Sequence, residues 1–222
     1  MNIIVAIDGP AGSGKGTLAK ALSKKLNLVN IDTGATYRCV ALKTLRNNID
    51  IEDEDEIVDI AKNINIDLLP DGTVLMDGED VTKEIRSKEV TAIVSPISSI
   101  IKVREIMVDI QRKIAEGKDV VMEGRDITTV VFPNAKYKFY LDANIETRAR
   151  RRYQENIEKG IDMTYEEVYE NIKARDYNDM HKKVGSLTRT DEQIYIDTTN
   201  LTVDEEVSII EKIIEEDKQW KN

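Results

Sequence analysis

A glycine-rich segment near the start of the chain has the residue types that bind phosphate. It consists of Gly9, Pro10, Ala11, Gly12, Ser13, Gly14, Lys15, Gly16 and Thr17, between an apolar run and a helical pattern. Glycines let the main chain wrap around a phosphate with its N–H groups inward, and the following helix adds a positive dipole end. The lysine is predicted to reach the β- and γ-phosphates of a nucleotide. A glycine-rich turn without a ligand is the alternative, and the strand–loop–helix context favours the phosphate loop.

The loop departs from the strict motif at one position. Gly16 stands directly after the lysine, where Ser or Thr is usual, and Thr17 follows it. Direct coordination of Mg²⁺ by the loop is therefore left open, and the sequence leaves the metal ligands unknown. Glu123, at the end of a later apolar run, either holds Mg²⁺ through water or merely ends its strand.

Positively charged side chains follow other apolar runs. Arg38 closes the segment after the second run, and Arg125 follows the run Val120–Met122. Ligands of open parallel sheets bind at the carboxyl ends of strands, so both arginines are expected to lie in the same crevice as Lys15. Further cations occur at Arg148, Arg150, Arg151, Arg152, Arg175 and Lys182. Consecutive helical residues point in different directions, so about two of the four clustered arginines are expected to face the site.

Cations gathered in an acidic chain suit phosphoryl transfer between two phosphate groups. The transferred group needs positioning, Mg²⁺ and cations beside its equatorial oxygens. A phosphate acceptor is mostly dianionic at pH 7 and needs no general base, so arginines are enough to hold it. A hydroxyl acceptor stays open as an alternative, because Asp32 or Asp126 could act as the base.

The order of apolar runs predicts an α/β fold. Runs suited to buried strands are Ile3–Ile7, Leu28–Ile31, Val120–Met122, Lys136–Leu141 and Gln193–Ile196. Helical patterns alternate with them, which predicts a parallel sheet with right-handed crossovers. Capping boxes at Thr164–Glu167 and Thr202–Glu205 predict the starts of two late helices. Residues 62–95 are expected to form a small β-rich insertion, and Arg148–Asp162 is expected to be irregular, as a mobile flap.

Composition limits the remaining possibilities. The chain has 222 residues, a formal net charge of −10, one cysteine and one histidine. This length predicts one domain, this charge argues against a nucleic-acid surface, and a zinc site built from several cysteines is excluded. A signal peptide and a membrane span are not expected, and a single cysteine suits a reducing cytoplasm. The D-x-x-G and N-K-x-D motifs of GTPases do not occur.

Longer motifs extend over nearly the whole chain. They are IDGPAGSGKGTLAK at 7–20, DTGATYR at 32–38, DGEDVTKEIR at 77–86, VRE at 103–105, EGRDITTVVFPNA at 123–135, KFYLDA at 138–143, ARRR at 149–152, IKARD at 172–176 and YIDTTNL at 195–201. Together they resemble the bacterial cytidylate kinases, a family of P-loop nucleoside monophosphate kinases. The combination of GRD with TVVFP is specific to that family, and the long β insertion separates it from the shorter adenylate and UMP–CMP kinases.

The resemblance implies a three-layer α/β fold with a five-stranded parallel sheet, as one kinase domain over residues 1–222. It implies a nucleoside-monophosphate-binding insertion at 62–95 and a helical lid at 148–163. ATP with Mg²⁺ is the implied donor, and CMP or dCMP is the implied acceptor. A cytoplasmic monomer that binds small nucleotides, and neither nucleic acid nor membrane, is expected.

The resemblance also implies roles for particular residues. Gly9–Thr17 would hold the ATP phosphates, and the implied catalytic residues are Lys15, Arg125, Arg148 and Arg152. The implied acceptor-binding residues are Thr33, Arg38 and Arg125 for the phosphate, Ser95, Arg104 and Asp126 for the cytosine, and Arg175, Asp179 and Lys182 for the ribose and phosphates. Lys182 replaces the family's usual arginine, whose bidentate contact a lysine cannot make. Gly185-Ser186-Leu187 replaces the usual Ser-Pro-Leu.

Two alternatives remain open at this point. The chain could be another small-molecule P-loop kinase, acting on AMP, UMP or shikimate. It could also be a P-loop nucleotide-binding protein that has no phosphoryl acceptor.

Overall fold

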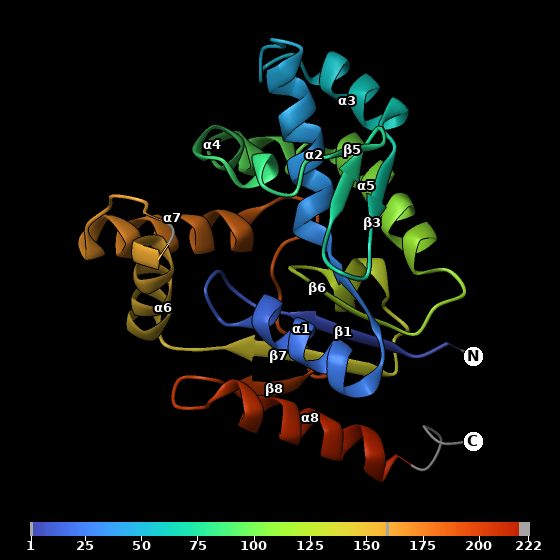
Figure 1. Cartoon of the computed structure of the whole chain (residues 1–222), viewed down its shortest axis with the longest axis vertical. Helices are drawn as coiled ribbons and strands as arrows, with labels where there is room; N and C mark the ends of the chain where they lie inside the picture. Colours follow the sequence, from blue (N-terminus) through green and yellow to red (C-terminus); the bar gives the residue numbers. More distant parts are fainter. Residues whose placement is uncertain (1, 159, 218–222) are drawn as a thin grey trace.

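A five-stranded parallel sheet forms the centre of the protein (Figure 1). The computed structural model describes residues 2–158 and 160–217. The strand order is β2-β6-β1-β7-β8 and every pair is parallel. The strands are β1 (Ile4–Asp8), β2 (Val29–Asp32), β6 (Val120–Gly124), β7 (Tyr137–Asp142) and β8 (Ile194–Asp197). The predicted α/β class and the five predicted strands are confirmed, with ends shifted by one or two residues.

Helices cover both faces of this sheet and make three layers. Val5 and Ile7 pack against α1 and α8, while Ala6 between them faces α5 and η2. Successive strand residues point to opposite faces, so a strand covered on both sides is apolar throughout. The covering elements are α1 (Lys15–Leu26), α8 (Val203–Glu216), α5 (Ile101–Ala115) and the π-helical turn η2 (Ile127–Val131).

A second apolar core lies above the sheet in Figure 1, among α2 to α5 and a small antiparallel sheet of order β3-β4-β5. Its elements are α2 (Thr33–Arg46), α3 (Glu54–Asn63), β3 (Ile66–Leu68), β4 (Val74–Met76), β5 (Glu79–Asp80), the 3₁₀ turn η1 (Glu84–Arg86) and α4 (Lys88–Ile97). The strand–turn–strand pattern predicted within 62–95 is therefore confirmed. Its role in binding a nucleoside monophosphate stays a prediction.

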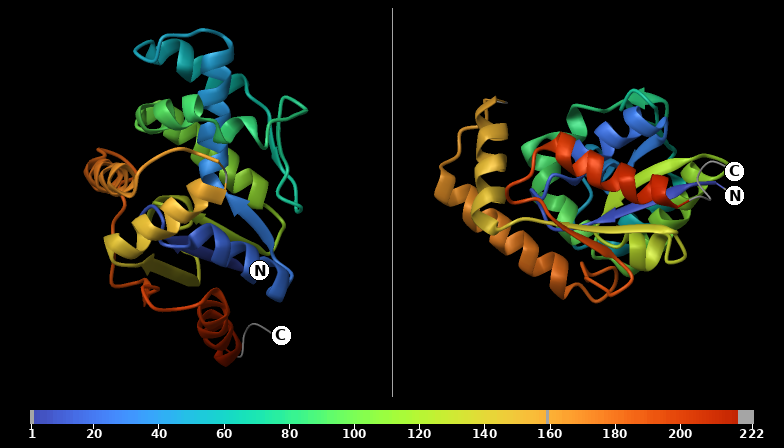
Figure 2. Two further views of the ribbon diagram at one scale, coloured as in Figure 1. Left: turned by 60° about the vertical axis from the view of Figure 1, so that its left-hand side comes forward. Right: turned by 90° about the horizontal axis from the view of Figure 1, so that it is seen from below.

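Two helices, α6 (Ile145–Glu158) and α7 (Tyr165–His181), lie together to one side of the sheet (Figure 2). The prediction that Arg148–Asp162 is irregular was wrong through Glu158. Asn144 begins α6 by accepting a hydrogen bond from the Thr147 N–H at 2.7 Å, and Ala149 is buried against α7. That segment is polar on most of its surface, and its few apolar residues, spaced four apart at Ile145, Ala149 and Tyr153, pack with α7 and stabilise the helix. Lys159, inside the predicted lid, lies outside the described residues.

Local capping signals agree with the structure at two helices. The Thr164 and Thr202 hydroxyls each accept a hydrogen bond from the backbone N–H of the glutamate three residues on, and the threonine N–H donates in turn to that glutamate's carboxylate. Both capping boxes are confirmed. Within the described part of the chain, no helix combines the length and apolarity needed to cross a membrane.

Candidate active site

The carboxyl ends of the central strands lie side by side and bring the predicted site residues to one edge. In the sheet register Asp8 is opposite Gly124, and Asp32 is opposite Glu123. The phosphate loop leaves β1 at this edge, and α2 and the Arg125–Asp126 segment leave β2 and β6 there. The expectation that these segments share one crevice is consistent with this register.

The phosphate loop needs its glycines for steric reasons. Gly9, Gly12 and Gly14 have φ values of 154°, 77° and 96°, which L side chains rarely adopt. A Cβ on Gly9 would lie 2.0 Å from the Leu141 carbonyl oxygen, and one on Gly12 would lie 3.0 Å from that of Arg148. The loop is therefore folded tightly against β7 and α6, in the conformation that a phosphate loop requires.

Lys15 is buried at the start of α1, inside the curve of the loop. Its Nζ donates hydrogen bonds to the Pro10 carbonyl oxygen at 2.7 Å and to Ser13 Oγ at 3.4 Å. Burial, followed by the positive charge of Arg125, lowers the pKa of Lys15 to about 7, against the opposing effect of Glu123. A triphosphate in the loop would supply the negative charge that this amine lacks.

Side chains from α6 and from the segment after β8 hold the outside of the loop. Arg148 donates from Nη1 to the Ala11 carbonyl oxygen at 3.1 Å, and the same nitrogen pairs with Asp176 at 2.5 Å. The Thr198 hydroxyl lies 3.0 Å from the Ser13 carbonyl oxygen. These contacts fix the loop before any nucleotide binds. Arg148, predicted as a catalytic lid residue, is here a buried brace of the loop.

Other clustered arginines differ in their surroundings. Arg151 donates to the Thr198 carbonyl oxygen at 2.6 Å and to the Ser13 carbonyl oxygen at 3.5 Å. Arg152 is half-buried and pairs with Glu155 at 2.9 Å. Sequence reasoning missed Arg151 and Thr198 as loop contacts, although both lie in motifs that carry the family resemblance. Their partners are far away in the sequence, so spacing alone could not identify them.

A cluster of cations surrounds the buried Asp179 on α7. Arg125 Nε donates to its carboxylate at 2.8 Å, Lys182 Nζ lies 3.1 Å from it, and Arg175 Nε lies 3.9 Å from it. Burial raises the pKa of Asp179, but these three cations outweigh that effect and bring it to about 2. One carboxylate therefore holds three cations together, and their net positive charge suits a phosphate dianion.

Arg38 and Thr33 on α2 contact two different parts of the site. Arg38 Nη1 donates to the Ile85 carbonyl oxygen at 3.1 Å and to Thr91 Oγ1 at 2.9 Å. The Thr33 hydroxyl donates to the Glu123 carbonyl oxygen at 2.8 Å. Burial, followed by the like charges of neighbouring arginines that include Arg125, lowers the pKa of Arg38 although Asp32 opposes it. Arg38 thus shares the electrostatic environment of the Asp179 cluster.

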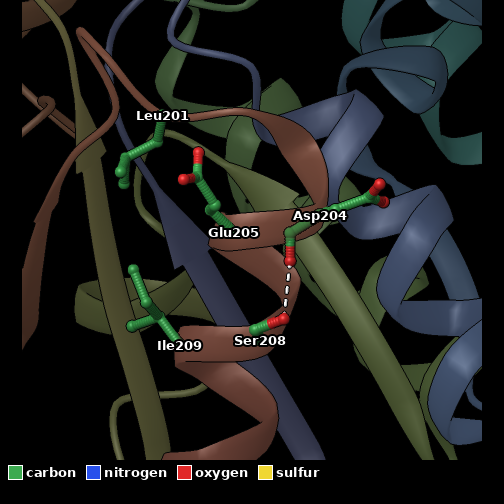
Figure 3. A pocket seen from close by; sticks show the side chains of 5 residues that line it. All are labelled: Leu201, Asp204, Glu205, Ser208 and Ile209. Carbon is green, nitrogen blue, oxygen red and sulfur yellow. Dashed lines mark hydrogen bonds between the residues drawn. The ribbon is translucent and has the colours of Figure 1, made fainter.

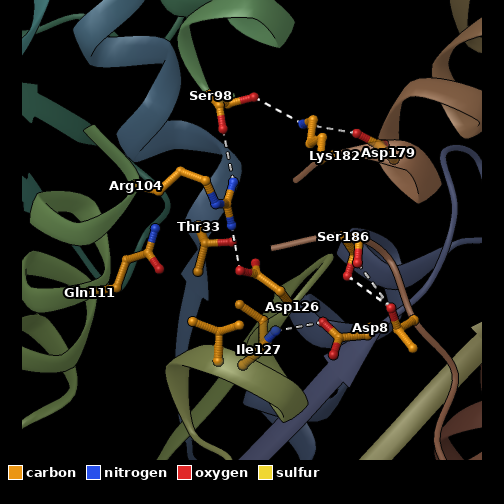
Figure 4. A network of polar contacts seen from close by, with 12 residues as sticks. Asp8, Thr33, Ser98, Arg104, Gln111, Asp126, Ile127, Asp179, Lys182 and Ser186 are labelled. Carbon is orange, nitrogen blue, oxygen red and sulfur yellow. Dashed lines mark hydrogen bonds and ion pairs between the residues drawn. The ribbon is translucent and has the colours of Figure 1, made fainter. Parts of the chain in front are cut away.

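Arg104 and Asp126 form a buried ion pair (Figure 4). Arg104 also donates to the Ser98 carbonyl oxygen at 3.0 Å, and its guanidinium lies over the Tyr37 ring at 5.3 Å. Ser95 is half-buried on α4, and its carbonyl oxygen accepts from Ser98 Oγ at 3.0 Å. The structure therefore brings Arg104 and Asp126 together. Ser98 connects Arg104 to Ser95, because the Ser98 carbonyl oxygen binds Arg104 and its hydroxyl binds the Ser95 carbonyl oxygen.

Two positions where the chain departs from the family pattern, Lys182 and Gly185, lie next to this ion pair. Lys182 Nζ donates to Ser98 Oγ at 3.1 Å, which joins the end of α7 to the end of α4. Gly185 has a φ of 65°, and a Cβ there would lie 2.0 Å from Arg104 Nη2. The backbone at Gly185 therefore packs directly on the guanidinium, an approach that a residue with a side chain could not make.

A shallow hollow on α8 contains none of these residues (Figure 3). It is lined by Leu201, Asp204, Glu205, Ser208 and Ile209. Ser208 Oγ donates within the helix to the Asp204 carbonyl oxygen at 2.8 Å. The hollow is a surface feature of one helix and its preceding loop, so the candidate site remains the edge of the sheet.

Comparison with known proteins agrees with this geometry. The family model described as cytidylate kinase matches residues 5–219. The chain belongs to the cytidylate kinase family. The cytidylate kinase of Fusobacterium nucleatum subsp. nucleatum is 51% identical over 98% of this chain and 99% of the relative. The cytidylate kinase of Caldanaerobacter subterraneus subsp. tengcongensis is 52% identical over 97% and 94% of the two chains. The predicted family is confirmed.

A solved structure supports the fold alone. The crystal structure of an uncharacterized protein from Eubacterium ventriosum superimposes with a TM-score of 0.53, at 15% identity, over 96% of this chain and 99% of that chain. At that identity the likeness carries no information on substrate. The assignment to the cytidylate kinases therefore depends on sequence, and the positions of the site residues come from the structure described above.

Proposed function

We propose that this chain transfers the γ-phosphoryl group of ATP to the 5′-phosphate of CMP or dCMP, giving ADP and CDP or dCDP. One observation carries the proposal. At a single edge of the sheet, Lys15 in a phosphate loop, the Asp179 cation cluster and the buried Arg104–Asp126 pair all come together. A donor triphosphate, an acceptor phosphate and a base each have a matching group there.

The cytosine is the part of the acceptor that Arg104 and Asp126 suit. A carboxylate accepts from the N4 amino group of cytosine, whereas uracil has a carbonyl oxygen at the same place and would be repelled. Among the residues that the structure describes, the buried Nε of Arg104 has no hydrogen-bond partner. Buried donors are nearly always paired, so an acceptor atom of the base is the proposed partner of this one, which the Gly185 backbone covers. Ser95 completes the proposed contacts to the cytosine.

Chemistry at the two phosphates needs positioning and charge, and no general base. The acceptor phosphate would lie against Arg38, Thr33 and Arg125, with its oxygen in line with the γ-phosphorus of ATP. Lys15 and Arg125 would stabilise the charge of the transferred group. Closure of α6 and α7, which carry Arg152 and Arg175, would exclude water.

The residues fit a Mg²⁺ ion that is held mainly by phosphate oxygens and water. A Cβ on Gly16 would lie 3.6 Å from Glu123 Oε1, so this carboxylate faces the loop. Among the described residues, no cluster of three or more ligating side chains could hold a metal by itself. Mg²⁺ commonly binds through one or two carboxylates and the substrate phosphates. Glu123, Asp32 and Thr17 would hold it, and Mg²⁺ would neutralise charge on the β- and γ-phosphates.

A coupled assay of ADP release with CMP, dCMP, UMP, AMP and shikimate as acceptors tests the proposal. CMP and dCMP should give the highest kcat/KM. A higher kcat/KM with AMP, UMP or shikimate would show that the proposed acceptor is wrong. ATP binding without ADP release in the presence of any of these acceptors would favour a non-catalytic nucleotide-binding protein. The predicted monomer and cytoplasmic location are separate proposals, which size-exclusion chromatography and cell fractionation test.

Replacement of Asp126 by Asn tests the base contact directly. An Asn side chain can donate to the uracil O4, so the ratio of CMP to UMP kcat/KM should fall by about tenfold or more. Thermal melting must accompany the kinetics, because the substitution also breaks the pair with Arg104. A folded variant with an unchanged ratio would remove Asp126 from base recognition.

A further inference from the structure

Asp8, the last residue of β1, has a fully buried carboxylate that accepts three hydrogen bonds. The Ile127 N–H donates at 2.8 Å, the Thr128 N–H at 2.9 Å and the Thr128 hydroxyl at 2.5 Å. All of these donors belong to the first residues of η2, about half the chain away in sequence. The contact with Ile127 is visible in Figure 4.

Asp8 also lies beside the start of the short connection between β6 and η2, residues 124–127. In the sheet it is opposite Gly124, the last residue of β6. The chain leaves Gly124, passes through Arg125 and Asp126, and returns to Asp8 at Ile127. The two residues between these points are the proposed acceptor-binding arginine and base-reading carboxylate. Both ends of their short loop are therefore held at one residue.

The hydrogen-bond pattern favours an ionised carboxylate, because two N–H groups and a hydroxyl point at it. Burial, with the charge of Asp126, opposes these bonds and on balance raises the pKa of Asp8. The Thr128 hydroxyl accepts from Gln193 Nε2 at 2.5 Å, so its own hydrogen is directed at Asp8. Each group around the carboxylate is thus a donor, which an acid proton on Asp8 would oppose.

We propose that Asp8 is a positioning residue for the acceptor site, which fixes Arg125 and Asp126 although it directly precedes the ATP loop. This inference rests on the proposed function. The Asp8 carboxylate is fully buried with η2 donors on both oxygens, so it would act through η2 and not by touching a substrate. Its loss should therefore affect CMP binding and base selection more than ATP binding.

Replacement of Asp8 by Asn tests whether the acceptor site is affected more than ATP binding. The amide is nearly isosteric, but its NH₂ group would face the N–H and hydroxyl donors of Thr128. A displaced catalytic group can cost about a hundredfold, so kcat/KM for CMP should fall by about ten- to a hundredfold. The ratio of CMP to UMP kcat/KM should fall with it. The dissociation constant of MgATP, measured by calorimetry without acceptor, should change by less than about twofold.

Thr128 supplies a milder variant and its matched control. Thr128→Val removes the hydroxyl bond and should lower CMP kcat/KM in the same direction, by about fivefold. Thr128→Ser keeps the hydroxyl and should retain wild-type constants. This pair decides the question if Asp8→Asn does not fold.

Several results would overturn the proposal. Equal losses in CMP and MgATP affinity would indicate that Asp8 only supports the fold. Wild-type constants in Asp8→Asn, or identical behaviour of Thr128→Ser and Thr128→Val, would show that these hydrogen bonds do not position the acceptor site. Failure of the proposed function is separate, because the wild-type protein itself would then not phosphorylate CMP.

Discussion

Replacement of the buried Lys15 by methionine should stabilise the ligand-free protein while it abolishes phosphoryl transfer. Lys15 is 5% exposed, and the pKa of its amine falls from an ordinary value of 10.5 to about 7. The unfolded chain therefore binds more protons than the folded protein between these values, so wild-type stability rises with pH across that window. The unfavourable contribution of Lys15 is largest below pH 7.

The size of the effect follows from the pKa of Lys15. At about 1.4 kcal/mol for each pKa unit, the buried amine costs the fold about 5 kcal/mol at pH 6 and about 3 kcal/mol at pH 8. Methionine removes that cost but leaves the Pro10 and Ser13 acceptors without their donor, a loss of about 2 kcal/mol. The net gain is about 3 kcal/mol at pH 6 and about 1 kcal/mol at pH 8. For a protein of this size, about 1 kcal/mol raises the melting temperature by about 2–4 °C.

Thermal melting of wild type and Lys15→Met at pH 6 and pH 8, in buffers free of phosphate and sulfate, measures this gain. The variant should melt higher, by more at pH 6, and MgATP should raise the melting temperature of the wild type alone. Lys20→Met is the matched control, because Lys20 is exposed on the same helix. If Lys15→Met melts no higher than wild type at pH 6, or its advantage does not shrink at pH 8, the argument from burial fails.

Four further substitutions, one of them with a matched control, test backbone conformation and particular contacts. Gly117→Ala, at a φ of 73° with nothing within 4 Å of its Cβ, should lower the free energy of unfolding by about 1 kcal/mol. Gly9→Ala, whose Cβ would collide with a carbonyl oxygen at 2.0 Å, should lower it by clearly more in urea titrations; equal losses would contradict the steric argument. Asp176→Asn leaves the buried Arg148 uncompensated and should cost about 3 kcal/mol, so an unchanged urea midpoint would refute the brace. Thr198→Val removes a hydroxyl that holds the phosphate loop and should weaken MgATP binding by about fivefold, while Thr198→Ser should not.

Short-range signals in the sequence determined the central sheet and the phosphate loop. Strands buried on both faces are apolar at every position, and the turns at Gly9, Gly12 and Gly14 are accessible almost only to glycine. The capping boxes at Thr164 and Thr202 are likewise complete within four residues. Each feature depends on neighbours in the chain, so the residues themselves were sufficient.

Tertiary structure decided which side chains meet. Arg148 and Arg152 lie one helical turn apart on the same side of α6, yet Arg148 is buried against Asp176 and the phosphate loop, whereas Arg152 is half-buried and pairs within its own helix with Glu155. Residues 148–158 were predicted to be irregular because most of them are polar, yet Ala149 and Tyr153 pack with α7 and the segment is helical. Asp8 finds its partners 119 and 120 residues along the chain. Contacts at such separations form only when the sheet sets two distant segments side by side, and no local pattern in the sequence records them.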